Sequence, residues 1–312
     1  MTAPEHSRVL AVFGPTAIGK TAVAVALADD LRDAGARPVA VSADALQVYR
    51  GLETLTGVAS PAQRAVLEHR LVSCLPLTER FSAGAFARLA HAEIDGLLAE
   101  GATPIVVGGT GLYLRAALAD LDLRPPPPPA LREHWEAELA AVGPRALHDR
   151  LAARAPWAAR DIPPTDASRL VRAHELLDLD ALAPAEGPSR LWTTETRHAT
   201  HLAALTMDRA ALYARIDARV DAMVAAGAAE EVRAADATGA SPTARKALGF
   251  EDLLRGDVEA MRRRTRQLAR RQLTWLRKLP AAVQRVDVTG RDPGDVAAEI
   301  LGAARRGAGR PP

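Results

Sequence analysis

The stretch Gly14-Pro15-Thr16-Ala17-Ile18-Gly19-Lys20-Thr21 decides the fold, because it matches the phosphate-binding P-loop pattern G-x-x-x-x-G-K-S/T. The apolar run at residues 9–13 predicts a strand before it, and residues 20–34, rich in Ala, Val and Leu, predict a helix after it. In that setting the backbone N–H groups of the loop and the N-terminus of the helix surround an anion. Lys20 neutralises phosphate oxygens, and Thr21 can ligate Mg²⁺. All eight residues are therefore predicted to bind a diphosphate or a triphosphate.

Two further loops that follow predicted strands carry polar signals. Residues 39–41 predict a strand that leads into Ser42-Ala43-Asp44, and residues 104–107 predict one that ends in Gly108-Gly109-Thr110. A helix is predicted between them at residues 85–98. This alternation predicts an α/β fold of the P-loop NTPase-like kind, a parallel sheet with helices on both faces. Because ligands bind at the carboxyl ends of parallel strands, we expect the P-loop, Asp44 and Thr110 to converge on one site.

The second half of the chain predicts an insertion. Five consecutive prolines, Pro125–Pro129, exclude helix and central strand and predict a stiff extended segment. Helical patterns then fill about residues 131–182, strands are predicted at 202–207 and 283–288, and the helices between these strands reach Lys278. We therefore predict a catalytic core in two parts, 1–124 and 201–306, an inserted all-helical subdomain at 125–200, and a disordered tail at 307–312.

Charge is balanced overall but uneven along the chain. With 40 basic and 38 acidic residues the net charge is +2, which does not by itself indicate a nucleic-acid partner. Residues 261–278, however, contain eight basic residues and no acidic one. On a helix, Arg263, Arg266, Arg270 and Arg277 share a face that suits RNA phosphates. The alternative is a basic face that is merely solvated.

Cysteine usage and hydropathy restrict the class of protein. The single cysteine, Cys74, excludes a disulfide framework or a cysteine zinc site within one chain, and a lone cysteine is usually buried. No stretch approaches the ~20 apolar residues of a membrane span, and no charged leader precedes an apolar core near the N-terminus. We therefore expect a cytoplasmic protein with no membrane partner, and we expect a monomer.

Three more segments resemble one known family. Residues 42–51, SADALQVYRG, resemble the "SADS-x-Q-V-Y-R-G" segment of tRNA dimethylallyltransferases, which are also called tRNA isopentenyltransferases. Residues 107–113 resemble their "VGGTGLY" segment, and residues 265–277 resemble "TRQLAKRQ-x-TW-x-R". With the P-loop, four motifs stand in the family's order over residues 14–277.

The resemblance implies that a dimethylallyl group passes from dimethylallyl diphosphate to N6 of the adenosine just 3′ of the tRNA anticodon. The P-loop then holds the leaving diphosphate, with Mg²⁺ at Thr21. Asp44 matches the family's general base, which an exocyclic amine needs because it is a poor nucleophile. Thr110 matches a residue near the reacting centre, and Arg215 matches an arginine that steadies the departing diphosphate. The alternatives are a capping or Mg²⁺-associated Asp44, an N-cap Thr110 and a solvated Arg215.

The resemblance also implies contacts with the anticodon stem-loop of tRNA. Gln47 resembles a residue that contacts the base, although a solvated or capping Gln is an open alternative. The matching residues are Gln47, Arg169, Arg172, Arg266, Gln267 and Arg270. Arg169 and Arg172 match the family's "ND-x-x-R-x-x-RA" stretch in the inserted subdomain.

The chain departs from the family pattern after Gly51. Residues 52–59 read LETLTGVA where the family usually reads "MDIGTAKP", so Val58 stands where a lysine is common. The usual "PHH" is Glu68-His69-Arg70, Ala45 replaces a Ser, and Phe250 follows Gly249 where Tyr is common. These changes put one cationic contact to the substrate in doubt and leave the P-loop, Asp44 and Thr110 intact.

Three rival functions remain open on the sequence. A small-molecule kinase would use ATP on the same P-loop, but the strand at residues 104–107 ends in Gly-Gly-Thr and not in the Asp of ordinary P-loop NTPases. A nucleotide-gated RNA-binding module would give Asp44 no role. An adenylate isopentenyltransferase acting on free nucleotide would give none to the helical insertion or to the basic residues 262–278.

Overall fold

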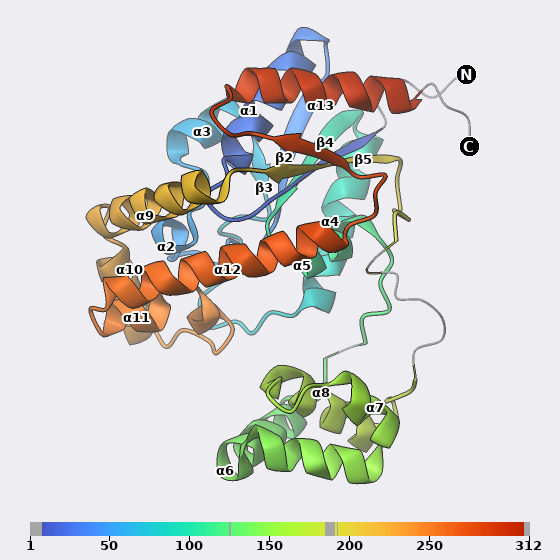
Figure 1. Cartoon of the computed structure of the whole chain (residues 1–312), viewed down its shortest axis with the longest axis vertical. Coiled ribbons are helices and arrows are strands. Elements are labelled where there is room, and N and C mark those ends of the chain that lie inside the picture. The colour runs from blue at the N-terminus through green and yellow to red at the C-terminus, as the bar shows by residue number, and fades with distance from the viewer. Residues whose placement is uncertain (1–7, 125, 185–190, 192, 309–312) are drawn as a thin grey trace. The chain divides into compact units, whose positions relative to one another are not determined.

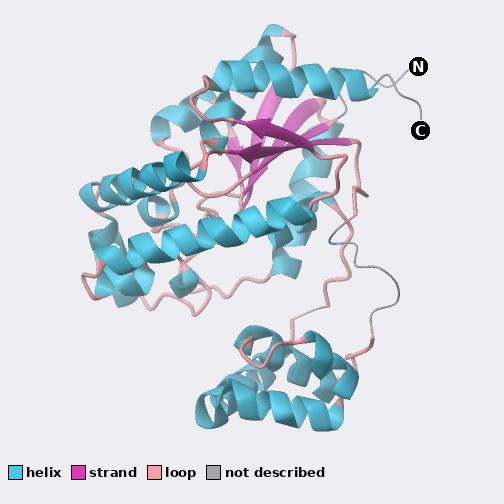
Figure 2. Cartoon of the chain, in the orientation of Figure 1, coloured by secondary structure: helices cyan, strands magenta, loops and turns pink. Residues whose placement is uncertain are grey.

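The computed structural model describes residues 8–124, 126–184, 191 and 193–308. The chain divides into two compact units, of which one comprises Met1–Leu123 with Arg190–Pro312 and the other Arg124–Ser189. The first unit contains a sheet with helices around it, and the second is a group of helices (Figures 1 and 2). No helix among the described residues has the length and apolar character to cross a membrane.

Six parallel strands form the sheet of the first unit, in the order β3-β2-β4-β1-β5-β6. The strands are β1 (Val9–Phe13), β2 (Arg37–Ala43), β3 (His69–Arg70), β4 (Ala102–Gly108), β5 (Thr200–Thr206) and β6 (Gln284–Asp287). The register pairs Gly108 with both Ala43 and Phe13. The three loops that begin at Asp44, Gly109 and Gly14 therefore start side by side, and the predicted α/β fold is confirmed.

Helices cover both faces of this sheet (Figures 1 and 2). The long helices are α1 (Lys20–Asp33), α4 (Ala83–Ala99), α5 (Gly111–Leu118), α9 (Arg209–Ala225), α10 (Ala228–Ala237), α12 (Val258–Lys278) and α13 (Pro293–Ala308). The short ones are α2 (Glu53–Thr56), α3 (Pro61–Val66), η2 (Ala244–Lys246) and α11 (Phe250–Leu254). A hydrophobic core lies on each face of the sheet, because successive side chains of a strand point to opposite faces. On one face Leu10 of β1 packs with α1 and α13, and on the other Phe13 packs with α4 and α5.

The second unit has a core of its own. Its helices are α6 (Pro129–Arg154), α7 (Pro156–Asp161) and α8 (Ala167–Asp178), and Trp135, Leu147 and Leu170 are buried among them. The prediction that the chain is extended as far as Pro129 is wrong for Pro129 itself, which is the first residue of α6. Proline is tolerated there because the first N–H groups of a helix have no partner within the helix. Gly143, with a φ of 78°, interrupts α6 before Pro144.

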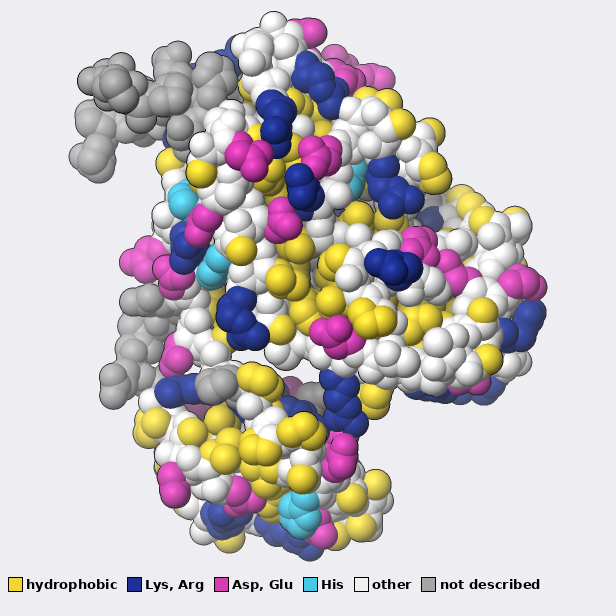
Figure 3. Space-filling model, turned by 180° about the vertical axis from the view of Figure 1, so that it is seen from behind, with side chains coloured by type: hydrophobic (Ala, Val, Ile, Leu, Met, Phe, Trp, Pro, Cys, Tyr) yellow, Lys and Arg dark blue, Asp and Glu magenta, His cyan; other side chains and the backbone are white. Residues whose placement is uncertain are grey.

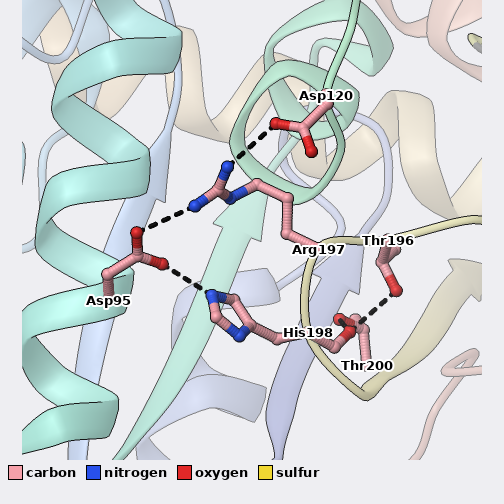
Figure 4. A network of polar contacts seen from close by, with 6 residues as sticks. All are labelled: Asp95, Asp120, Thr196, Arg197, His198 and Thr200. Atoms are coloured by element: carbon pink, nitrogen blue, oxygen red, sulfur yellow. Dashed lines mark hydrogen bonds and ion pairs between the residues drawn. The ribbon is translucent and has the colours of Figure 1, made fainter.

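The chain that returns to β5 belongs to the first unit and not, as predicted, to the helical insertion. The Arg197 backbone N–H donates to the Leu118 carbonyl at 2.8 Å, and its guanidinium donates to Asp95 at 2.8 Å and Asp120 at 2.9 Å. The His198 Nε2 lies 2.6 Å from the other oxygen of Asp95 (Figure 4). Burial alone would raise the pKa of Asp95, but the His198 bond and the Arg197 charge outweigh it and lower that pKa.

Two further expectations need correction. Residues 307 and 308 belong to α13, which the sequence pattern missed, and the rest of the predicted tail, 309–312, lies outside the described residues. Cys74, expected to be buried, is exposed, and its backbone N–H donates to the Val48 carbonyl at 2.8 Å.

Candidate functional site

The P-loop turns between β1 and α1 as a preformed anion cradle. Ala17 has a φ of 64° and Gly19 a φ of 103°, and such left-handed residues direct successive N–H groups to one side. The Lys20 ammonium donates to the carbonyls of Gly14 at 3.0 Å and Pro15 at 2.9 Å. Burial and, to a smaller extent, the charge of Arg219 lower the pKa of Lys20 to about 8, and the charge of Asp44 partly opposes this shift. The loop therefore holds a desolvated cation beside its N–H groups.

Asp44 lies directly after β2, near the two cations of the site. Its Oδ1 accepts the backbone N–H groups of Leu46 at 2.9 Å and of Gln47 at 3.4 Å, so one oxygen holds the local turn. Burial, the neighbouring Tyr49 and the Asp44 charge raise the pKa of Tyr113 to about 12, which keeps its phenol protonated. The predicted meeting of Asp44 with the P-loop is confirmed, and its role as a base stays a prediction.

Small residues let the three loops approach one another. A Cβ on Gly108 would lie 2.8 Å from the Ala43 carbonyl oxygen, and one on Gly109 would lie 3.1 Å from that of Gly14. Side chains there would force the strand ends apart. Thr110 occupies the N-cap position of α5 but makes no capping bond with its side chain, so the hydroxyl is not spent on the helix.

Gln272 on α12 is a site residue that the sequence interpretation missed. Its Oε1 accepts the Thr16 backbone N–H at 2.9 Å, and its Nε2 would lie 2.7 Å from a Cβ on Gly109. One amide thus contacts both the P-loop and the loop after β4. The sequence does contain a pattern that could have identified Gln272. It falls at helical spacing with Ala269 and Leu276, so it lies on the buried face of α12.

Arg219, which the sequence interpretation did not select, lies deeper in the site than Arg215. Its Nη2 donates to the Gly57 carbonyl at 3.5 Å, and its charge influences the pKa of Lys20. A Cβ on Gly57 would lie 1.8 Å from this Nη2, so the glycine makes room for the guanidinium. Arg215 is exposed, with its Nη2 3.2 Å from where a Cβ on Gly19 would lie. Arg219 therefore brings a cation next to Val58, where the family lysine is missing.

Residues 52–59, which depart from the family pattern, are bound by side chains from two other segments. The Gln47 amide donates to the carbonyls of Thr56 and Gly57, both at 3.3 Å, and its Oε1 accepts the Ser42 hydroxyl at 2.9 Å. Glu231 on α10 accepts the N–H groups of Thr54 and Leu55 at 2.9 and 2.8 Å. In this structure Gln47 orders the loop, and its contact with a base stays a prediction.

The two arginines predicted in the helical unit differ in their surroundings. Arg169 is exposed on α8. Arg172 binds the buried Glu175 at 3.2 Å and the Arg124 carbonyl at 3.2 Å, and Arg132 binds the same carboxylate at 2.6 Å. Arg172 therefore has a structural task, whereas Arg169 presents its guanidinium to solvent.

The basic helix α12 is partly neutralised by acids from other segments. Arg266 is paired with Asp217 of α9, and Arg262 with Asp221 of the same helix. Within the described part of the chain, Arg270 and Arg271 have no carboxylate partner. Residues 261–278 contain no acid, but α12 carries less free positive charge than this suggests, because Asp217 and Asp221, which are distant in sequence, neutralise two of its arginines.

Known protein families and curated proteins are similar to this chain over most of its length. A family model described as IPP transferase matches residues 47–279, and one described as isopentenyl transferase matches residues 7–79. A tRNA dimethylallyltransferase of Kineococcus radiotolerans is 40% identical over 306 residues, which cover 94% of this chain and 95% of that protein. Another, of Anaeromyxobacter sp. (strain K), is 45% identical over 286 residues, which cover 87% and 90%.

A solved structure agrees with these relatives. The full-length tRNA isopentenylpyrophosphate transferase from Bacillus halodurans matches with a TM-score of 0.68 and 30% identity, over 96% of this chain and 97% of that one. The first family model spans more than half of the chain, and both relatives match it almost end to end. This chain, with its P-loop beside Asp44 and Arg219, therefore belongs to the IPP transferase family.

Proposed function

We propose that this protein transfers the dimethylallyl group of dimethylallyl diphosphate to the exocyclic N6 of the adenosine immediately 3′ of the anticodon in tRNA. The observation that carries the proposal is the meeting of a carboxylate, Asp44, with the P-loop and two cations, Lys20 and Arg219. Alkylation of an amine needs a proton acceptor beside the leaving diphosphate, and Asp44 lies where it can serve as one. A kinase of the ordinary P-loop kind would instead place an Asp at the end of the strand at residues 104–107 to hold Mg²⁺, and this chain has Gly-Gly-Thr there. The relatives named as tRNA dimethylallyltransferases support the same choice.

In the proposed step, N6 attacks the first carbon of the dimethylallyl group. The new N–C bond forms as the C–O bond to the diphosphate breaks, and the N6 proton passes to Asp44. Charge then grows on the diphosphate oxygens, where the P-loop N–H groups, Lys20 and Arg219 stabilise it. Arg215 and Thr110 remain proposed contributors, Arg215 at the rim beside Gly19 and Thr110 through a hydroxyl not spent on capping.

We propose Mg²⁺ as the cofactor, held by the Thr21 hydroxyl and by the diphosphate. Among the described residues, no three His, Cys, Asp or Glu side chains come together as a metal site. One hydroxyl together with diphosphate oxygens suits Mg²⁺, which keeps water ligands and binds through few protein groups together with substrate phosphates. When bound, the ion would neutralise charge on the departing diphosphate.

The proposal is tested by incubating the purified protein with dimethylallyl diphosphate, Mg²⁺ and unmodified tRNA, followed by nucleoside analysis. We expect N6-isopentenyladenosine in the tRNA digest. Prenylation of free adenosine nucleotides without prenylated tRNA would indicate an adenylate isopentenyltransferase instead. Phosphoryl transfer from ATP with no prenylated product would indicate a kinase and overturn the proposal.

A further inference from the structure

The four-residue helix α2 has no N-terminal cap of its own. Its N-cap residue is Leu52, an apolar side chain that makes no capping bond. The first backbone N–H groups of a helix have no partner within it, so they need an acceptor from elsewhere. Glu231 of α10 is that acceptor, since its Oε1 accepts the Thr54 N–H at 2.9 Å and its Oε2 accepts the Leu55 N–H at 2.8 Å. The start of α2 is therefore capped by a side chain that is distant in sequence.

The other end of α2 contacts a cation. Gly57, with a φ of 61°, follows the last residue of the helix, and its carbonyl accepts the Arg219 Nη2 at 3.5 Å. The helix dipole favours negative charge at the N-terminus of a helix and positive charge at its C-terminus. Glu231 and Arg219 therefore each bind the end of α2 that suits their charge. Arg219 lies on α9 and Glu231 on α10, which are consecutive in the chain, so one pair of helices holds α2 at both ends.

Glu231 differs from an ordinary surface carboxylate. On the face of the molecule shown in Figure 3, acidic side chains stand at the surface among basic and apolar ones. Glu231 is half-buried, and both of its oxygens accept backbone N–H groups. The preceding residue, Glu230, is exposed and pairs with Arg233 at 3.1 Å. Of these two adjacent carboxylates on α10, one thus binds α2 and the other stays at the surface.

Arg219 reaches the P-loop site past the end of α2. A Cβ on Gly57 would lie 1.8 Å from the Arg219 Nη2, so the guanidinium lies against the bare backbone of that residue. Burial lowers the pKa of Arg219 and the charge of Asp44 opposes this shift, as expected for a desolvated guanidinium near a carboxylate. The Arg219 charge also lowers the pKa of Lys20 in the P-loop. The place of Gly57 therefore decides where this cation acts.

We propose that Glu231 is a positioning residue for diphosphate binding. By fixing the start of α2 it sets the place of the Gly57 carbonyl, which in turn holds the Arg219 guanidinium in the P-loop site. Because α2 is a single turn, about 6 Å long, a displacement of its first residues is carried to its end. Glu231 cannot itself attract an anion, since its own charge opposes the binding of one. The part of Arg219 in holding a diphosphate rests on the proposed function.

The test is a double-mutant cycle with inorganic diphosphate as the probe. Calorimetry in the presence of Mg²⁺ gives the Kd for the wild type, Glu231→Ala, Arg219→Gln and the double variant. We expect Glu231→Ala to weaken binding by roughly three- to tenfold, although it removes a negative charge. In the Arg219→Gln background the same change should have little further effect, because both residues act on one contact.

Two further variants complete the comparison. Glu231→Gln keeps one acceptor oxygen, so its Kd should fall between those of the wild type and Glu231→Ala, and it replaces Glu231→Ala in the cycle if that variant does not fold. Glu230→Gln is the matched control, because it neutralises the adjacent exposed carboxylate, and it should leave the Kd unchanged.

A merely structural role of Glu231 predicts a different result. Loss of folded protein would lower the number of binding sites and the midpoint of urea denaturation while the Kd stayed unchanged, and the proposal would be wrong. Tighter binding by Glu231→Ala would mean that only the charge of Glu231 matters, and an equal loss in both backgrounds would mean that it acts without Arg219. Either result would overturn the proposal. Because the binding of inorganic diphosphate needs neither tRNA nor prenyl transfer, the cycle remains readable even if the protein proved not to prenylate tRNA.

Discussion

The Asp44 carboxylate uses one oxygen to hold its own turn, so an amide can replace it without loss of that contact. Asp44→Asn keeps an oxygen for the Leu46 and Gln47 N–H groups but cannot accept the N6 proton. We expect the single-turnover rate to fall by ~10²-fold or more. Affinity for dimethylallyl diphosphate should hold or rise, because a negative charge beside Lys20 is removed. Filter binding and rapid-quench kinetics measure the two effects, and equal losses in rate and tRNA affinity would make Asp44 structural.

Lys20 gives the diphosphate site a measurable pH dependence. Burial and Arg219 lower its pKa to about 8, so at pH 8 about half of the free protein has a neutral Lys20. A bound diphosphate favours the ammonium and raises this pKa. Binding should therefore take up about half a proton at pH 8, and this uptake should vanish near pH ~6, where Lys20 is charged in both states.

Calorimetry in buffers of different ionisation enthalpy measures this proton uptake. The control is Lys20→Arg, because a guanidinium stays charged across the range. The wild-type uptake minus that of the variant isolates Lys20 from the titration of the ligand. No difference at pH 8 would mean that the lysine is already charged before the diphosphate arrives.

At the residue scale the sequence predicted where the loops meet but not every side chain that meets there. The P-loop, Asp44 and Thr110 follow strand ends, and the topology of a parallel sheet brings strand ends together. Arg215 and Arg219, in contrast, stand four apart on one helix, each just before a buried residue. The sequence pattern therefore does not show which of the two arginines enters the site. The feature that admits Arg219 is Gly57, which leaves space for its guanidinium.

Two elements, α5 and α12, are joined by the contact of Gly111 with Trp275. A Cβ on Gly111 would lie 1.9 Å from a carbon of the Trp275 ring, and a rigid ring cannot evade it without moving the helix. Gly111→Ala should therefore destabilise the protein by about 1–3 kcal/mol, as overpacking does. Because α12 also carries Gln272, we expect weaker diphosphate binding as well. Urea denaturation and a titration with dimethylallyl diphosphate measure both.

A second glycine-to-alanine change provides the matched control. Gly96 lies within α4, and a Cβ there would meet nothing within 4 Å. Gly96→Ala should therefore stabilise the protein by up to ~1 kcal/mol through helix propensity alone. If both variants shifted the denaturation midpoint in the same direction, the contact of Gly111 with Trp275 would not be the cause of the change in stability of Gly111→Ala.

At the element scale, periodicity predicted the long buried strands and α12 well because their apolar residues recur regularly. It missed α13, although the buried Val296, Ile300 and Ala304 recur there every four residues, as on one face of a helix. The sequence interpretation also extended the insertion to residue 200, whereas the chain from Arg190 onward belongs to the first unit. The contacts of Arg197 with Asp95 and Asp120 decide that boundary, and no local pattern reveals partners so distant in sequence.

At the scale of the whole molecule, the two units have separate cores, so we expect the helical unit to fold by itself. Residues 124–189 bury Trp135 and Leu151, and the Trp135 Nε1 donates to Asp178 at 2.8 Å within the same unit. A fragment of these residues should give a helical circular-dichroism spectrum and a cooperative thermal transition. Its stability should be modest, because so short a chain buries only about 60% of its unfolded surface.

Asp178→Asn provides the variant for this fragment. The Arg154 and Trp135 bonds outweigh burial and lower the pKa of Asp178, so its charged form stabilises the fold above the unfolded pKa of about 4 and this contribution is lost as the pH falls below that value. The stability of the fragment should therefore drop between pH ~5 and pH ~3, and Asp178→Asn should show less of that drop. A fragment that remains unfolded at neutral pH would instead show that the helices need the first unit to acquire their structure.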